Sequence, residues 1–223
     1  MTFTTSEYTS PKRPRWVLPA IGGVVVIALV GVLALAVTMR DSPQPTSPAQ
    51  RTSTPATVDL TAAPAQLEWK LIDGVRLPYS KIDGPAKVSG SLATGYSHTP
   101  QGAVVAAWQI SSRLAVSTDY ERVMATQVRG TESERTQVRQ EVAEVRNLTP
   151  DQFSARFKQP IGFQIVSYDP TFAQIYFAVQ SPNGGYDFVA RAVLWDGKDW
   201  QYQLVSGLPT LPNSTSVAGY TLF

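Results

Sequence analysis

The sequence contains no cysteine and only one histidine, His98. The absence of cysteine excludes disulfide bonds, thiolate metal ligands and cysteine nucleophiles. A single histidine cannot supply the histidine clusters of catalytic metal centres. The sequence also has no D-x-[DN]-x-[DN]-G calcium loop and no G-x-x-x-x-G-K-[ST] phosphate loop. We therefore predict no metal and no cofactor.

The chain has almost no net charge beyond its first residues. The formal charge is +2, and residues 1–15 supply it through Lys12, Arg13 and Arg15 against Glu7. The remaining residues carry 16 basic and 16 acidic side chains. Because nucleic-acid-binding domains usually show a basic excess, we predict no direct contact with nucleic acid.

One segment lacks charge altogether. Residues 16–37, WVLPAIGGVVVIALVGVLALAV, would form a helix about 33 Å long, enough to cross a hydrocarbon core of roughly 30 Å. The basic residues before this segment place residues 1–15 in the cytoplasm by the positive-inside rule. We predict a single-pass protein of the cell membrane, with a transmembrane helix over 16–38 and an extracytoplasmic C-terminal domain. The bilayer is then its first partner.

A cleaved signal peptide is the alternative for this segment. Ala34-Leu35-Ala36 matches the small-x-small pattern of a cleavage site after Ala36. The apolar run is long for a signal peptide, which favours a retained span. Both alternatives place the following domain outside the cytoplasm.

Composition divides the rest of the chain into three parts. Residues 39–66 hold five prolines and eight Ser or Thr without an aromatic residue, which is typical of an extended linker. Residues 67–206 carry the hydrophobic patterns of a folded domain. Residues 207–223 show no clear periodicity, so we predict an irregular tail that covers a sheet edge.

The first half of the domain favours turns and then helices. Residues 67–97 are rich in Gly and Pro, so we expect short extended pieces across a domain surface. Thr99 and Pro100 are typical of a helix start, followed by apolar residues at helical spacing. The predicted helices are a buried one over 100–115, a short one over 118–126, one beginning at Thr131 with a capping box to Glu134, and one over 150–157.

From Ile161 the hydrophobic period changes to two, which indicates strands. Asn-Gly at 183–184 and Asp-Gly at 196–197 are hairpin signals. The predicted strands are 161–169, 172–181, 186–196 and 199–206. Helices followed by an antiparallel meander predict an α+β fold, with helices packed on a curved antiparallel sheet of about four strands.

The stretch Gly95-Tyr96-Ser97-His98-Thr99 resembles a nucleophile elbow, but it lacks the last glycine. His98 is the immediate neighbour of Ser97, and no second histidine exists to act as its base. The simpler interpretation is that Gly95 permits a turn, Thr99 caps the helix and His98 lies at the surface. We therefore predict that the protein is not an enzyme. If it were one, Asp169 and Asp187, beside strand aromatics, would be the first carboxylates to test.

Two resemblances add to these predictions. The layout is similar to the bitopic assembly-factor subunit of type IV secretion systems, which implies a nuclear-transport-factor-two-like, cone-like outer domain. LPYSKIDGP (77–85) and GYSHTPQGAVVAA (95–107) resemble an uncharacterised membrane-anchored domain family of actinobacterial conjugative elements and plasmids. The matching residues are Pro78, Ser80, Gly84, Pro85, Gly95, Tyr96, His98, Thr99, Pro100, Gly102, Ala103, Ala106 and Ala107.

The resemblance implies a mobile-element context and no catalytic residue. We predict a membrane-anchored, non-enzymatic component of a conjugation or type IV secretion-like apparatus, whose outer domain binds other membrane or secretion subunits or itself. The candidate partner surface is the motif set Tyr96, His98, Thr99, Gln101 and Gly102. The alternative is an extracytoplasmic ligand-binding or sensing domain with a pocket between sheet and helices.

Overall fold

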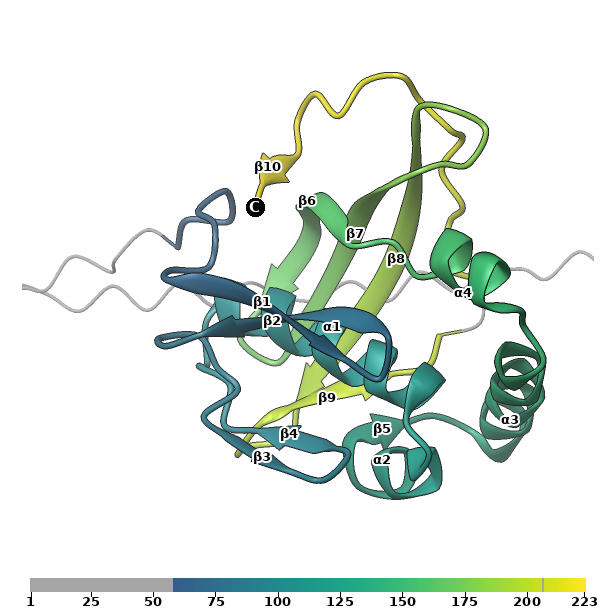
Figure 1. Ribbon diagram of the computed structural model, residues 1–223. Helices are drawn as coiled ribbons and strands as arrows, with labels where there is room; N and C mark the ends of the chain where they lie inside the picture. Colours follow the sequence, from purple (N-terminus) through teal and green to yellow (C-terminus); the bar gives the residue numbers. More distant parts are fainter. Residues whose placement is uncertain (1–57, 206) are drawn as a thin grey trace, which may run out of the picture. The chain divides into compact units, whose positions relative to one another are not determined.

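The computed structural model describes residues 58–205 and 207–223 (Figure 1). Four short strands come first, four helices with one short strand between them follow, and strands make up the rest. The strands and helices are β1 (Leu67–Ile72), β2 (Val75–Ser80), β3 (Lys87–Ser89), β4 (Leu92–Thr94), α1 (Pro100–Val116), α2 (Tyr120–Gln127), β5 (Val128–Arg129), α3 (Glu132–Arg146), α4 (Pro150–Arg156), β6 (Pro160–Asp169), β7 (Phe172–Gln180), β8 (Tyr186–Trp195), β9 (Trp200–Gln203) and β10 (Thr221–Leu222).

The main sheet has six strands in the order β10-β6-β7-β8-β9-β5. Its centre is the antiparallel meander β6 to β9, which agrees with the four predicted strands. Two short strands extend it beyond the prediction. β5 pairs in parallel with β9, and β10 pairs with β6 from within the tail that was expected to be irregular. The domain is therefore α+β with a mixed sheet.

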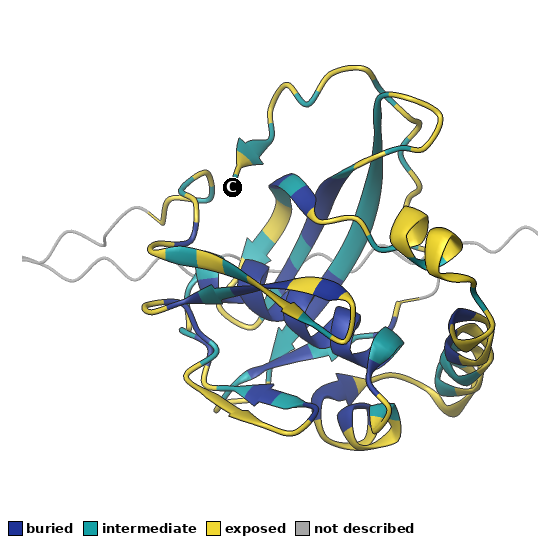
Figure 2. Ribbon diagram, in the orientation of Figure 1, coloured by how far each residue is buried: buried dark blue, intermediate teal, exposed yellow. Residues whose placement is uncertain are grey.

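Helix α1 lies at the centre of the described domain, as Figure 2 shows by its burial. One side of α1 contacts β8 and β9 of the main sheet, and another side contacts β2. Ala103, Ala106, Ala107 and Ile110 are each 0% exposed. Burial on more than one side explains why the apolar residues of α1 extend beyond a single stripe.

The helix starts follow the predicted capping chemistry. Thr99 caps α1 by accepting a hydrogen bond from Gly102 N at 3.0 Å, and Pro100 occupies the first turn. Thr131 and Thr149 each form a complete capping box, with Glu134 and Gln152 respectively. Each cap satisfies backbone N–H groups that have no partner inside the helix.

Residues before α1 form two hairpins, β1-β2 and β3-β4. They were expected to lie across a surface, and β1 and β3 are largely exposed. Strand β2 differs, since Val75 and Leu77 are buried against α1. The first hairpin therefore forms the second wall around α1, opposite the main sheet.

Residues 58–66, assigned to the linker by composition, lie against the domain. Gln101 Nε2 donates to the carbonyl oxygens of Asp59 and Ala62 at 2.9 and 3.1 Å. Thr221 Oγ1 donates to Thr61 O at 2.8 Å. Ordered contacts therefore begin several residues before Leu67.

The described residues fall within one compact unit, 53–223, which contains the hydrophobic core described above. A unit with its own core is expected to fold by itself. No helix in the described part of the chain is long and apolar enough to cross a bilayer. The span predicted over 16–38 lies outside the described residues.

A substitution at Gly102 tests how tightly the start of α1 packs against the preceding turn. A Cβ at this position would lie 2.0 Å from the carbonyl oxygen of Ser97. Gly102→Ala is therefore expected to lower the free energy of unfolding by about 3 kcal/mol, measured by urea denaturation of residues 53–223. Ser133→Ala, on the exposed first turn of α3, should change it by less than about 0.5 kcal/mol. Equal effects of the two substitutions would contradict the packing argument.

Candidate functional site

The motif residues predicted as a partner surface gather at the start of α1, but they do not share one environment. Tyr96 is 4% exposed, and burial raises the pKa of its hydroxyl well above the ordinary value. Thr99 serves as the helix cap, and Gly102 fits closely against Ser97. Gln101 binds the preceding segment through its side-chain amide. Only His98 is exposed.

A buried carboxylate joins the two halves of the motif. Asp83 is 4% exposed, and its oxygens accept hydrogen bonds from Ala65 N and Ser97 Oγ, both at 3.0 Å. Ser80 Oγ and Thr99 Oγ1 also donate to it, at 3.3 and 3.4 Å. Residues of LPYSKIDGP and GYSHTPQGAVVAA therefore meet in one polar cluster around Asp83. This cluster fixes the backbone that leads into α1.

A second carboxylate fixes the turn before α1. Asp199 accepts hydrogen bonds from Gly95 N at 2.7 Å and from Tyr96 N at 3.1 Å. Burial raises the pKa of Asp199, although these backbone donors favour its charged form. The contact ties the turn to the hairpin between β8 and β9. It gives this carboxylate a structural role.

His98 lies on an aromatic surface. Its ring stacks on Trp195 with centroids 4.0 Å apart and meets Trp200 edge-on at 5.8 Å. A ring nitrogen also hydrogen-bonds the carbonyl oxygen of Pro170. These contacts fix His98 against the ends of strands β8 and β9.

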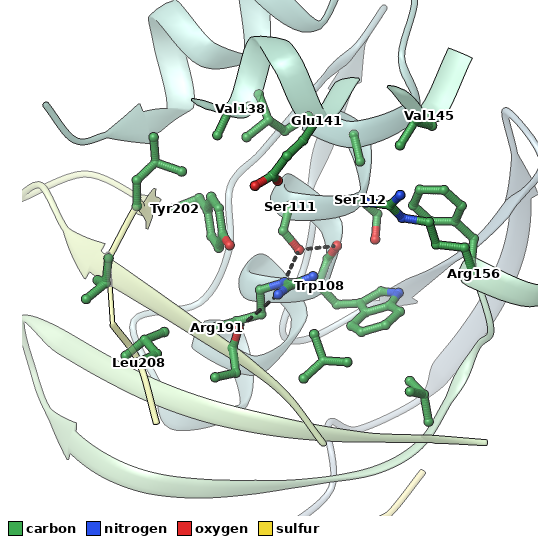
Figure 3. A pocket seen from close by; sticks show the side chains of 18 of the residues that line it. Trp108, Ser111, Ser112, Val138, Glu141, Val145, Arg156, Arg191, Tyr202 and Leu208 are labelled. Carbon is green, nitrogen blue, oxygen red and sulfur yellow. Dashed lines mark hydrogen bonds between the residues drawn. The ribbon is translucent and has the colours of Figure 1, made fainter. Parts of the chain in front are cut away.

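A pocket of about 520 Å³ opens between the main sheet, α1 and α3 (Figure 3). This volume is in the range of about 300–1,000 Å³ that is common for small-molecule sites. Trp108 comes from α1, Val142 and Val145 from α3, Phe157 follows α4, and Leu208 lies in the tail. The walls therefore come from both ends of the domain, and much of the lining is apolar.

Arg191 is the main polar feature of the pocket floor. It lies on the central strand β8, where its register partner on β7 is the fully buried Ile175. Its Nε donates to Ser111 Oγ of α1 at 3.1 Å, and its Nη1 donates to its neighbour Ala190 O at 2.9 Å. Figure 3 shows Arg191, Ser111 and Tyr202 pointing into the same part of the pocket.

No carboxylate of the described residues forms an ion pair with Arg191. Four basic side chains and two acidic ones line the pocket, and the basic ones are Arg76, Arg156, Lys158 and Arg191. Glu134 is engaged by Thr131 in the capping box, while Glu141 accepts a hydrogen bond from Gln137. The lining is therefore net positive.

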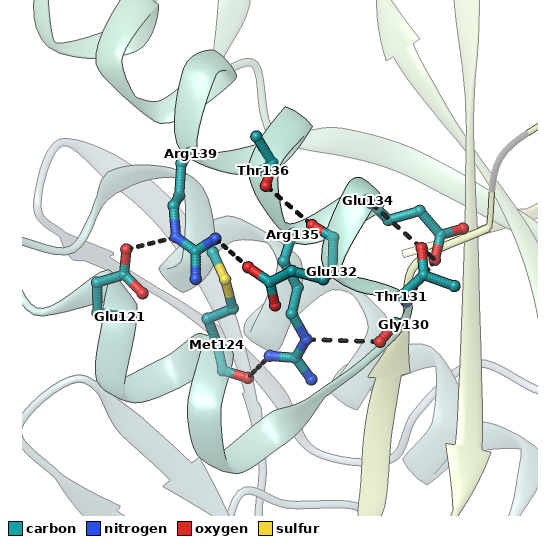
Figure 4. A network of polar contacts seen from close by, with 9 residues as sticks. All are labelled: Glu121, Met124, Gly130, Thr131, Glu132, Glu134, Arg135, Thr136 and Arg139. Atoms are coloured by element: carbon teal, nitrogen blue, oxygen red, sulfur yellow. Dashed lines mark hydrogen bonds and ion pairs between the residues drawn. The ribbon is translucent and has the colours of Figure 1, made fainter.

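Polar contacts attach the pocket wall α3 to the rest of the domain (Figure 4). Arg135 donates to the carbonyl oxygen of Met124 in α2 at 2.9 Å. Arg139 binds Glu121 of α2 at 3.0 Å and Glu132 of its own helix at 2.8 Å. These bonds fix the N-terminal half of α3, so its apolar stripe faces the pocket in a defined orientation.

Sequence reasoning anticipated a pocket between sheet and helices as one alternative, but it did not name the lining residues. Asp169 and Asp187, the carboxylates proposed for an enzyme, are not among the lining residues. Asp169 binds Thr171, and these hydrogen bonds lower its pKa. Asp187 accepts from Asn213 at 3.0 Å. Arg191 could have been found, because it is a charged residue in register with the apolar positions Val189 and Val193.

Within the described residues, no group of three or more His, Asp or Glu side chains is placed to hold a metal ion. A family model with the description "Domain of unknown function (DUF8175)" matches residues 36–222, most of the chain. No curated protein matches the chain. No solved structure matches it either.

Substitutions of Asp83 and His98 compare the contribution of a buried motif residue to stability with that of an exposed one. Asp83→Ala removes the acceptor of several buried donors and is expected to lower the free energy of unfolding by about 3 kcal/mol. His98→Ala loses the contacts with Trp195 and Trp200 and one hydrogen bond at an exposed site, and should lower the free energy of unfolding by about 1 kcal/mol. Thermal and urea unfolding of residues 53–223 measure both. A larger loss for His98→Ala than for Asp83→Ala would contradict this assignment.

Proposed function

The chain belongs to the DUF8175 family, and we propose that its described domain is a non-enzymatic binding domain that receives a small amphipathic molecule in the pocket beneath α3. The observation that carries this proposal is the pocket itself. It combines a row of valines on α3 with charged and polar groups, Arg191 among them, and its volume suits a small ligand. This arrangement supports binding or sensing, the alternative raised by the sequence.

The wider setting is also a proposal. The apolar segment 16–38 with its basic N-terminal flank supports a membrane anchor, with residues 1–15 in the cytoplasm and the domain outside. The paired motifs support a place in the domain family of actinobacterial conjugative elements. The central helix on one face of the meander supports a cone-like, nuclear-transport-factor-two-like architecture. Such a protein would present its pocket outside the cytoplasm.

A second candidate is assembly with other secretion subunits or with a second copy of the chain. The observation that favours it is the hairpin β1-β2, a separate two-stranded sheet in which β1 pairs only with β2 among the described strands. β1 also exposes Leu71, at 64%. An edge strand with an exposed apolar side chain is suited to pairing with another chain.

The pocket proposal is tested with N-phenyl-1-naphthylamine, a neutral probe whose fluorescence increases in apolar sites. Residues 53–223 are expected to bind it at one site per chain. Val138 lines the pocket, so Val138→Trp should fill part of the space and weaken binding about tenfold or more. Val88→Trp, on exposed β3, is the matched control and should bind normally. Absence of saturable binding, or equal binding by both variants, would refute the pocket proposal.

The assembly proposal is tested by light scattering of residues 53–223 over a range of concentrations. A concentration-dependent dimer is expected if β1 pairs with a second copy. Replacing Leu71 by Lys should then shift the protein toward the monomer, because it places like charges at the edge. A monomer at every concentration would exclude self-assembly of this domain through β1.

A further inference from the structure

We propose that the pocket recognises single-chain amphiphiles with an ionised carboxylate, and that Arg191 is the residue that binds the carboxylate. The inference rests on the proposed function of the pocket and names its ligand class. It starts from the position of Arg191 on an apolar sheet face. Ile175 and Val193, its neighbours on that face, are both fully buried. Arg191 itself is only partly buried, and an anion beside it would compensate a cation that lies next to buried apolar side chains.

The contacts within the domain compensate Arg191 only in part. Guanidinium carries five N–H donors, and the described bonds use Nε and one donor of Nη1. Nη2 donates to no atom of the described residues. The Nη1 and Nη2 edge is the part of guanidinium that binds a carboxylate with two parallel hydrogen bonds.

A buried arginine of the same domain, Arg113, has an acceptor at each of its three guanidinium nitrogens. Arg113 is 2% exposed and forms no ion pair with a carboxylate of the described residues. Its donors nevertheless reach Gln109 Oε1 and Tyr79 Oη at 2.9 Å, and two backbone carbonyl oxygens on the β3-β4 turn at 3.5 Å. Arg113 lies in the core and needs no ligand, whereas Arg191 faces an open pocket with unused donors.

The polar groups near Arg191 have opposing effects on an anionic head group. Ser111 receives the Nε bond while donating to Ala107 O at 2.7 Å, so it fixes the guanidinium on the α1 side. Tyr202 lines the same part of the pocket. Glu141 points into the pocket from α3, yet it forms no ion pair with Arg191. It would compete with a bound carboxylate and weaken its binding.

The apolar part of the lining suits a single apolar chain. Val138, Val142 and Val145 form one stripe on α3, and Trp108 and Phe157 continue the apolar wall. Figure 3 shows Val145 at one end of the pocket and Arg191 near its middle, beside Trp108. A carboxylate at Arg191 would therefore direct its chain beneath α3. The planar guanidinium edge matches a carboxylate better than a quaternary ammonium or an alcohol.

The experiment measures displacement of N-phenyl-1-naphthylamine from residues 53–223 by three amphiphiles with the same chain. Dodecanoate is expected to displace the probe at a concentration about tenfold lower than dodecanol or dodecyltrimethylammonium, because it gains charge-assisted hydrogen bonds. Arg191→Gln should remove this advantage while leaving binding of the neutral probe within about twofold.

Two control variants locate the effect. Arg156→Gln removes an exposed lining cation and should weaken dodecanoate binding less than about threefold. Glu141→Gln should leave dodecanoate binding equal or tighter, because it removes a like charge. The carboxylate proposal is overturned if dodecanoate has no advantage over dodecanol, or if Arg191→Gln keeps that advantage. Failure of the neutral probe to bind would instead refute the proposed function of the pocket.

Discussion

Helix α1 is buried over most of its surface, so segments on more than one side must cover it, and this constraint shapes the domain. Its alanines and valines allow the sheet and the β1-β2 hairpin to approach closely. Buried polar groups on α1 then need partners from the enclosing segments. Gln109 donates to Pro78 O at 2.7 Å, and Arg113 reaches Tyr79 and the β3-β4 turn. The two hairpins before α1 are therefore positioned by its polar residues as well as by its apolar ones.

Much of the fold could be predicted because local chemistry determines it. Thr99, Thr131 and Thr149 satisfy helix N-termini within a few residues of themselves, so their capping role is readable from the sequence. The meander strands carry a hydrophobic period of two over much of their length, and two of their turns carry Asn-Gly and Asp-Gly. The short strands β5 and β10 could not be predicted, because their pairing depends on edges formed by distant residues.

The candidate site was harder to predict for the same reason. Its lining comes from β2, three helices, the sheet and the tail, so no short motif encodes it. The most distinctive motif in the sequence, around His98, instead forms the entry to α1 through Asp83 and Asp199. Arg191 interrupts an apolar alternation on β8, which is a weaker signal but the one that marks the pocket. A charged residue among apolar residues on the helix-facing side of a strand was therefore the sequence feature that pointed to the pocket.

The contact between Thr221 and Thr61 brings the two ends of the described domain together. Figure 1 shows β10 beside the first described residues, while α3 and α4 lie on the opposite side of the domain. The first and the last residues of the described domain therefore lie next to each other, joined by these two threonines. A short linker between these two ends would allow new termini to be placed elsewhere, for example at the exposed hairpin turn 182–184. Such a circular permutant would keep the packing around α1, although the strands and helices that cover α1 would follow one another in a different order along the chain.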